Sequence, residues 1–165
     1  MASVSNSKLS QSATGIQDNK DAFVVIVRTE WNAFIVDQLE NACKKKLAEA
    51  GVRVVKVLTV PGAFEIPFCI KGYWEMKKDG VNRPKVFIAL GCVLRGETPH
   101  FDYICKAVTD GIMQLNLMLP VPVIFGVLTV DTQLQAEERI GGKHGHKGEE
   151  AALTAIKMMN LDLLL

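Results

Sequence analysis

Four short runs rich in apolar and β-branched residues are separated by segments of helix length, and this alternation restricts the fold more than any other feature. The runs cover 22–27, 52–60, 86–90 and 123–130. Near-continuous apolar runs are typical of strands buried on both faces, because a solvated face would require polar residues at alternate positions. The alternation therefore predicts an α/β protein in which a parallel sheet is covered by helices on both sides.

The segments between the runs carry helix signals. Within 31–50, apolar residues recur every four positions and form one helical stripe: Ile35, Leu39, Cys43 and Leu47. Further helices are predicted over 65–78, 99–117 and 148–160. A short one follows Thr132, where Gln135 completes a capping-box signature. With four strands, the expected architecture is a small flavodoxin-like fold, a three-layer α/β/α sandwich around a four-stranded parallel sheet.

Length and composition limit the organisation and the partners. We expect residues 1–20, rich in Ser, Asn and Gln, to form a flexible tail, and 21–165 to form a single domain. A net charge of +1 without a basic stripe predicts no nucleic-acid partner. No apolar run is long enough for a membrane span, so no membrane association is expected. The apolar end, 161–165, fits either burial against another subunit or packing on its own sheet.

The cysteines and the start of the chain indicate where the protein works. The four cysteines lie far apart in apolar surroundings and form no Cys-x-x-Cys pair. This usage is typical of reduced thiols in the cytoplasm. The first 20 residues lack the apolar segment of a secretory signal. We therefore expect a cytoplasmic protein.

The segment Gly91–Asp102 follows the third apolar run and leads into a predicted helix. Its Gly91-x-x-x-x-Gly96 spacing approaches that of a P-loop, but Glu97 stands where a triphosphate would require lysine. A nucleoside triphosphatase is therefore excluded. Thr98 as N-cap and Pro99 as first helical residue would leave backbone N–H groups free for a single phosphate. An ordinary capped helix with no ligand is the alternative.

Three side chains follow different strands at the same edge of the sheet, where ligands bind in open α/β folds. His100 can accept and give a proton near neutral pH, although a lone histidine is often structural. Glu65 fits either a favourable charge at a helix start or an acceptor for the hydroxyl groups of a polyol. Trp31 fits either the core or a platform that stacks on a planar ring.

The glycine-rich segment 141–148 contains His144 and His146, which suggests metal binding at first sight. The segment offers no carboxylate or thiolate ligand beside the two histidines, and a zinc site would require His100 as a third ligand. We therefore expect no metal and interpret the segment as a flexible, cationic connector. Arg139, just before it, could clamp a phosphate.

Four motifs in order resemble the 6,7-dimethyl-8-ribityllumazine synthase family, over about residues 20 to 160. They are 60–67 (VPGAFEIP), 91–103 (GCVLRGETPHFDY), 122–129 (PVIFGVLT) and 138–143 (ERIGGK) with Lys147-Gly148. The resemblance implies a transferase of the penultimate step of riboflavin biosynthesis. It would condense 5-amino-6-(D-ribitylamino)uracil with 3,4-dihydroxy-2-butanone 4-phosphate, without a cofactor, and release phosphate and water.

The resemblance also assigns roles to residues. His100 would be the catalytic proton-transfer residue. The ribitylaminouracil would contact Trp31, Ala63, Phe64, Glu65, Cys92, Val93, Leu94, Phe125 and Lys147. The phosphate would contact Glu97, Thr98 and Arg139. Glu97 would donate its backbone N–H, which can bind a phosphate whatever side chain the residue carries. Trp31 replaces the commoner Phe, which enlarges the stacking surface.

The resemblance further implies an assembly. Phe125, Arg139 and Lys147 would come from the neighbouring subunit of a homopentamer. The connector from Arg139 to Gly148 has no insertion, which is compatible with pentamers packed into an icosahedral capsid. Two alternatives of other classes share the fold: a protein that binds riboflavin without turnover, and a structural shell.

Overall fold

The computed structural model describes residues 19–161. Of the predicted tail 1–20, residues 1–18 lie outside the described residues, and Asn19 is buried. Of the apolar end 161–165, only Leu161 is described, and it is exposed. The expectations for these two segments therefore stay predictions.

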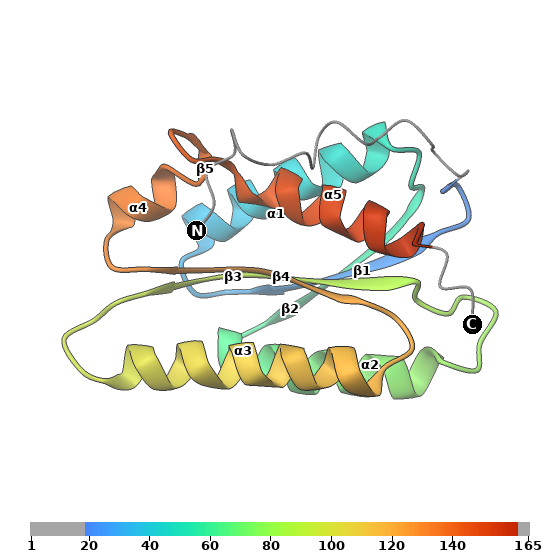
Figure 1. The fold of residues 1–165 in the computed structure, drawn as a ribbon, viewed down its shortest axis with the longest axis horizontal. Helices are drawn as coiled ribbons and strands as arrows, with labels where there is room; N and C mark the ends of the chain where they lie inside the picture. The colour runs from blue at the N-terminus through green and yellow to red at the C-terminus, as the bar shows by residue number, and fades with distance from the viewer. Residues whose placement is uncertain (1–18, 162–165) are drawn as a thin grey trace.

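A single four-stranded parallel sheet forms the middle layer of the molecule (Figure 1). Its strands are β1 (Phe23–Thr29), β2 (Val54–Val60), β3 (Val86–Leu94) and β4 (Val123–Val130). The order β2-β1-β3-β4 places the first and third strands in the centre and leaves β2 and β4 at the edges. All three pairings are parallel, so the carboxyl ends of the strands meet at one edge. The predicted flavodoxin-like α/β fold is confirmed.

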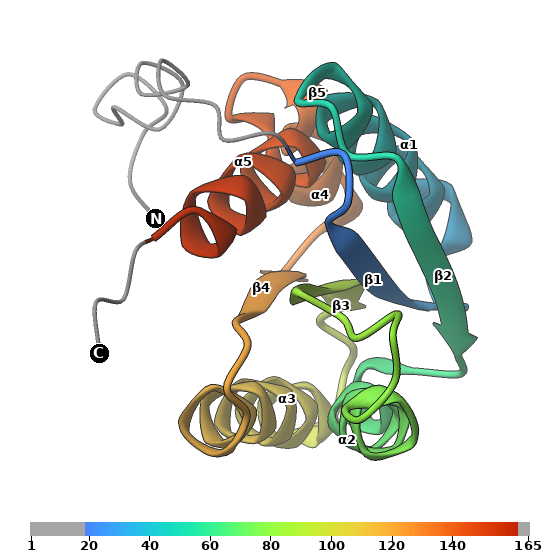
Figure 2. The ribbon, with the colours of Figure 1, turned by 90° about the vertical axis from the view of Figure 1, so that its right-hand side faces the viewer.

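Helices cover both faces of this sheet, as Figure 2 shows end-on. One face carries α1 (Ala33–Glu49) and α5 (Lys147–Met159), and the other carries α2 (Ile66–Lys77) and α3 (His100–Met118). A 3₁₀ helix, η2 (Ala63–Glu65), precedes α2, and a short α4 (Gln133–Glu137) follows β4. The three-layer sandwich is therefore complete within one chain.

The core consists of two apolar clusters, one on each side of the sheet. Alternate residues of each central strand enter different clusters: Val24 and Ile26 pack toward α1 and α5, while Val25 and Val27 pack toward α2 and α3. All four are fully buried. Burial on both faces explains why the central strands are almost uniformly apolar.

The third strand is longer than predicted. The apolar run predicts an end at Leu90, but the strand continues to Leu94, because residues 91–94 pair with residues 127–130 of β4. A Cβ at Gly91 would lie 3.2 Å from the Thr29 methyl carbon, so the glycine permits close packing rather than starting a loop. The segment after Gly91 therefore projects from a strand.

The expected caps differ in outcome. Thr132 is confirmed as the cap of α4, since its hydroxyl accepts from the Gln135 backbone N–H (3.2 Å). The prediction for α3 was wrong: the helix begins at His100, preceded by Pro99, and no side chain caps it. The Thr98 hydroxyl therefore does not satisfy the N–H groups of the first turn of α3.

The connector 141–148 is more regular than predicted. Ile140–Gly142 (β5) and Gly145–His146 (β6) pair as a two-stranded antiparallel hairpin. Gly141 and Gly145 both have positive φ, at 114° and 73°, which glycine adopts without strain. The connector between α4 and α5 therefore contains a hairpin that the sequence did not predict, while its predicted flexibility stays a prediction.

The cysteine thiols are reduced and sheltered from solvent to different degrees. The four cysteines are free thiols, with Cys43 and Cys92 buried and Cys69 and Cys105 half-buried. Burial raises the pKa of Cys43 to about 12 and that of Cys92 to about 11, which disfavours the nucleophilic thiolate. Within residues 19–161, no helix combines the length and hydropathy that a membrane crossing requires.

Candidate active site

A hollow of about 750 Å³ opens at the carboxyl edge of the sheet. It contains eight of the residues predicted for the site: Trp31, Ala63, Phe64, Glu65, Cys92, Val93, Leu94 and His100. Asn32, Gly62 and Ile104 complete its lining. The hollow combines the ends of β1, β2 and β3 with the first turns of α3, where an open α/β sheet is expected to bind a ligand.

The loops after β1 and β2 are joined by backbone hydrogen bonds. Glu30 N–H donates to the Val60 carbonyl (2.9 Å), and Trp31 N–H donates to the Pro61 carbonyl (3.3 Å). Within the loop after β2, Gly62 N–H donates to Glu65 Oε2 (3.0 Å). Trp31 is 72% exposed, and Phe64 is 60% exposed, so neither belongs to the core. The structure thus presents two aromatic faces beside a carboxylate that is already held at the start of η2.

Asn32 is a site residue that sequence reasoning missed. It has φ 57° and ψ 44°, the left-handed region, and its side-chain amide donates to the Cys92 carbonyl (2.8 Å). The bond ties the start of α1 to the end of β3. Asparagine is one of the few residues that adopt this conformation readily, and that preference was the available signal.

Replacing Asn32 with alanine is expected to lower the free energy of unfolding by about 2 kcal/mol, because it removes a hydrogen bond and strains a left-handed residue. Asn32→Gly keeps the conformation and loses only the bond, so its loss should be smaller. Urea denaturation followed by circular dichroism measures both. Equal stability of the alanine and glycine variants would contradict the role of the backbone conformation.

His100 is the first residue of α3 and lines the hollow from the third loop. Its side chain is exposed and makes no hydrogen bond or ion pair with residues 19–161. The imidazole is therefore available to a ligand. Glu97 and Thr98 are exposed in the turn before it and do not line the hollow, so their predicted phosphate contacts stay predictions.

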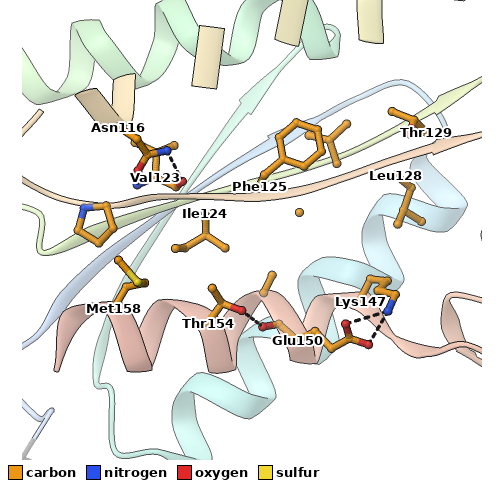
Figure 3. A pocket seen from close by; sticks show the side chains of 14 residues that line it. Asn116, Val123, Ile124, Phe125, Leu128, Thr129, Lys147, Glu150, Thr154 and Met158 are labelled. Carbon is orange, nitrogen blue, oxygen red and sulfur yellow. Dashed lines mark hydrogen bonds and ion pairs between the residues drawn. The ribbon is translucent and has the colours of Figure 1, made fainter. Parts of the chain in front are cut away.

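Two predicted residues lie in a second hollow of about 650 Å³ along the edge strand β4 (Figure 3). They are Phe125 and Lys147. Figure 3 shows Lys147 at the start of α5, where its Nζ contacts both carboxylate oxygens of Glu150 at 2.8 Å. Neither residue lines the first hollow, so one chain does not bring the whole predicted site together.

Arg139 lies in neither hollow. Its Nη1 donates to the Gln135 carbonyl (2.7 Å), while its Nε is buried without an acceptor in the described part of the chain. Because this Nε is buried, it is not accessible to a phosphate in the single chain. A buried donor without a partner is uncommon, because it loses water without a replacement.

Similarity to known proteins shows the family of the chain. The profile of the family described as 6,7-dimethyl-8-ribityllumazine synthase matches residues 21–162. Curated proteins of that name are similar along most of the chain. That of Parabacteroides distasonis is 48% identical over 149 residues, 88% of this chain and 89% of the relative. That of Porphyromonas gingivalis is 49% identical over 145 residues, 87% of each chain.

The chain belongs to the 6,7-dimethyl-8-ribityllumazine synthase family. It is an enzyme, a transferase that carries out the lumazine synthase reaction in riboflavin biosynthesis. A more distant relative of the same name, from Campylobacter lari, is 44% identical over 144 residues. The similarity thus extends across relatives from different organisms, over the part of the chain that carries both hollows.

The two histidines of the connector, His144 and His146, make contacts that explain them without a metal ion. His146 Nδ1 accepts from the Gly148 N–H (3.3 Å) and so caps α5. Burial lowers the pKa of His146, which favours the neutral ring that this cap requires. His144 Nε2 lies 3.6 Å from Glu138 Oε2. Within the described residues, no group of three metal-ligating side chains is placed to hold an ion.

Proposed function

We propose that the first hollow binds 5-amino-6-(D-ribitylamino)uracil and that His100 transfers the protons of its condensation with 3,4-dihydroxy-2-butanone 4-phosphate. The observation that carries the proposal is that Trp31 and His100, far apart in the sequence, line one hollow at the switch point of the sheet. Trp31 stacks on the pyrimidine ring. Glu65, together with backbone groups of the loops, accepts hydrogen bonds from the ribityl chain.

The chemistry needs a group that both accepts and donates protons. The amine of the pyrimidine attacks the ketone, and loss of water gives an imine; phosphate then leaves, and the ring closes with loss of a second water. Each step moves a proton, and none is an oxidation or a reduction, so no redox cofactor is required. An unpartnered imidazole beside the reacting atoms can serve several of these transfers in turn.

We place the phosphate at the turn before α3. The first N–H groups of that helix have no side-chain cap, and the positive end of its dipole favours an anion. Glu97 contributes its backbone N–H, and Thr98 its hydroxyl, which is not used as a cap. Because His100 begins the helix, phosphate binding and proton transfer are coupled through one short segment.

We further propose that Phe125, Arg139 and Lys147 complete the site of a neighbouring copy in a homopentamer. One observation supports this: Phe125 and Lys147 line a hollow of their own at the sheet edge, away from the first hollow. The compact hairpin after Arg139 is compatible with further packing of pentamers into an icosahedral capsid. We also infer that 21–165 is one domain and that the enzyme is cytoplasmic.

A mixing experiment tests the shared site. His100→Ala and Lys147→Ala, each impaired alone, are co-assembled at equal amounts. In a head-to-tail ring, about a quarter of the sites then combine an intact His100 with an intact Lys147 from the neighbour. Activity should rise well above that of either variant. The readout is the lumazine chromophore formed from both substrates.

The matched control is a mixture of His100→Ala with Trp31→Ala, because both residues line the same hollow and every mixed site keeps one defect. This mixture should stay at the level of its components. If the His100 and Lys147 mixture also stays at that level although a tag on one variant co-purifies the other, the site belongs to one chain. A wild-type protein that is folded yet forms no product would refute the reaction itself.

A further inference from the structure

The guanidinium of Arg95 joins three parts of the molecule at the carboxyl edge of the sheet. Its Nε donates to Asp131 Oδ1 (2.7 Å), just after β4. Its two Nη atoms donate to the carboxylate of Asp102, in the first turn of α3, at 3.1 and 3.4 Å. Its central carbon lies 4.0 Å from the centre of the Phe101 ring. We call Arg95, Phe101, Asp102 and Asp131 the Arg95 clasp.

The clasp lies on the turn that carries the proposed phosphate site. The turn, 95–99, is exposed along its whole length and begins one residue after β3. Arg95 N–H donates to the Val130 carbonyl (2.9 Å), but the side chains of residues 96–99 make no hydrogen bond or ion pair within residues 19–161. Apart from Arg95, no side chain of this turn anchors it to the sheet.

The geometry of the clasp is specific for arginine. A planar guanidinium can donate to two carboxylates in fixed directions while its face stacks on an aromatic ring. A single exposed ion pair is weak, but two carboxylates and a ring contact on one group act together. Lysine, as a point charge on a flexible stem, can neutralise one carboxylate without holding both.

The clasp also changes the charge near the helix start. Asp102 lies in the first turn of α3, where a phosphate would bind to the free N–H groups. Unpaired, its carboxylate would repel the phosphate, and Asp131 would add to the repulsion. Arg95 pairs with both. Arg95 therefore holds the turn in place and also neutralises the carboxylates that would repel the phosphate.

We propose that Arg95 is a positioning residue for the lumazine synthase reaction. It holds the turn 95–99 so that the phosphate-binding N–H groups and His100 act on substrates bound in the same site. Arg95 does not line the hollow and acts through the turn. The proposal rests on the proposed function, because it assigns the phosphate and the proton transfer to this segment.

Steady-state kinetics test the positioning role. Arg95→Ala should lower kcat/KM for the phosphate substrate by about 10- to 100-fold, because displacement of reacting groups by about 1 Å has effects of this size. The KM for the pyrimidine should change little, since Trp31 and Glu65 are held by other loops. Arg95→Lys should lower kcat/KM for the phosphate substrate almost as much as Arg95→Ala does. In a double-mutant cycle, Arg95→Ala and Asp131→Asn should be clearly non-additive.

The matched control is Arg83→Ala, which also removes an arginine from an aromatic ring, that of Trp74 at 5.9 Å. It should keep wild-type kinetics. Full recovery of activity by Arg95→Lys would overturn the proposal, because charge alone would then suffice. An equal increase in the KM for both substrates, together with a lower melting temperature, would also overturn the proposal, because it would indicate a general structural role.

A second measurement does not depend on turnover. Hydrogen–deuterium exchange of peptides covering 95–103 should be faster in Arg95→Ala than in wild type and unchanged in Arg83→Ala. Inorganic phosphate should slow exchange in this segment of the wild type and have less effect on Arg95→Ala. Unchanged exchange in Arg95→Ala would refute the clasp. An inactive wild type with the expected exchange would refute the proposed function and leave the clasp intact.

Discussion

Replacing His100 with alanine is expected to lower kcat by about 10²- to 10⁴-fold, the usual contribution of a positioned proton-transfer group. His100 lines the hollow from the start of α3, and its side chain has no partner in the described chain, so the substitution removes little but the imidazole. Substrate binding should persist, because Trp31 and the loops around it remain. Single-turnover absorbance with both substrates measures the rate, and titration with the pyrimidine measures binding.

The matched control for this prediction is His144→Ala. His144 is half-buried on the hairpin and lies outside the first hollow, so its loss should leave kcat within a few-fold of wild type. A loss of less than about tenfold in His100→Ala, with the fold intact, would assign His100 a structural role. A loss confined to KM would instead make it a binding residue.

The second large effect concerns stability and is expected for Gly148→Ala. A Cβ at Gly148 would lie 2.2 Å from the Leu39 carbonyl oxygen and 2.9 Å from its Cα, so α5 and α1 contact each other backbone to backbone. The helices would have to separate, because backbone atoms cannot rotate aside as a side chain can. We expect a loss of at least about 3 kcal/mol, the upper end for overpacked cores, out of a total of about 5–15 kcal/mol.

Urea denaturation measures this loss, and Gly72→Ala is its control. Gly72 lies inside α2, and a Cβ there would meet nothing within 4 Å. Alanine should therefore stabilise the helix by about 0.5–1 kcal/mol. The two substitutions add the same methyl group and should change stability in opposite directions. Wild-type stability in Gly148→Ala would show that the two helices adjust without cost.

The sequence predicted the sheet well because burial on both faces leaves a strong pattern. The run 123–130 coincides with β4, and all four strands and their carboxyl edge were placed correctly. The failures were local. The apolar pattern predicts a strand end before Gly91, but this glycine packs closely against Thr29, a contact between two strands that no local pattern contains.

The same distinction applies to the site. The rule that loops after parallel strands meet at one edge brought Trp31, Glu65 and His100 together, and the structure confirms that they share a hollow. Asn32 was missed because its role depends on a hydrogen bond to distant Cys92. The Arg95 clasp was missed for the same reason, since Asp131 comes close only after β4 has paired with β3.

The two separate hollows have a genetic consequence. Under the proposed shared site, each copy serves two sites, one through Trp31 and His100 and one through Phe125 and Lys147. A copy defective in both halves would inactivate the site on each side of it. In a cell that makes normal and defective copies together, the intact sites would fall as the square of the normal fraction, so such an allele would behave as partially dominant.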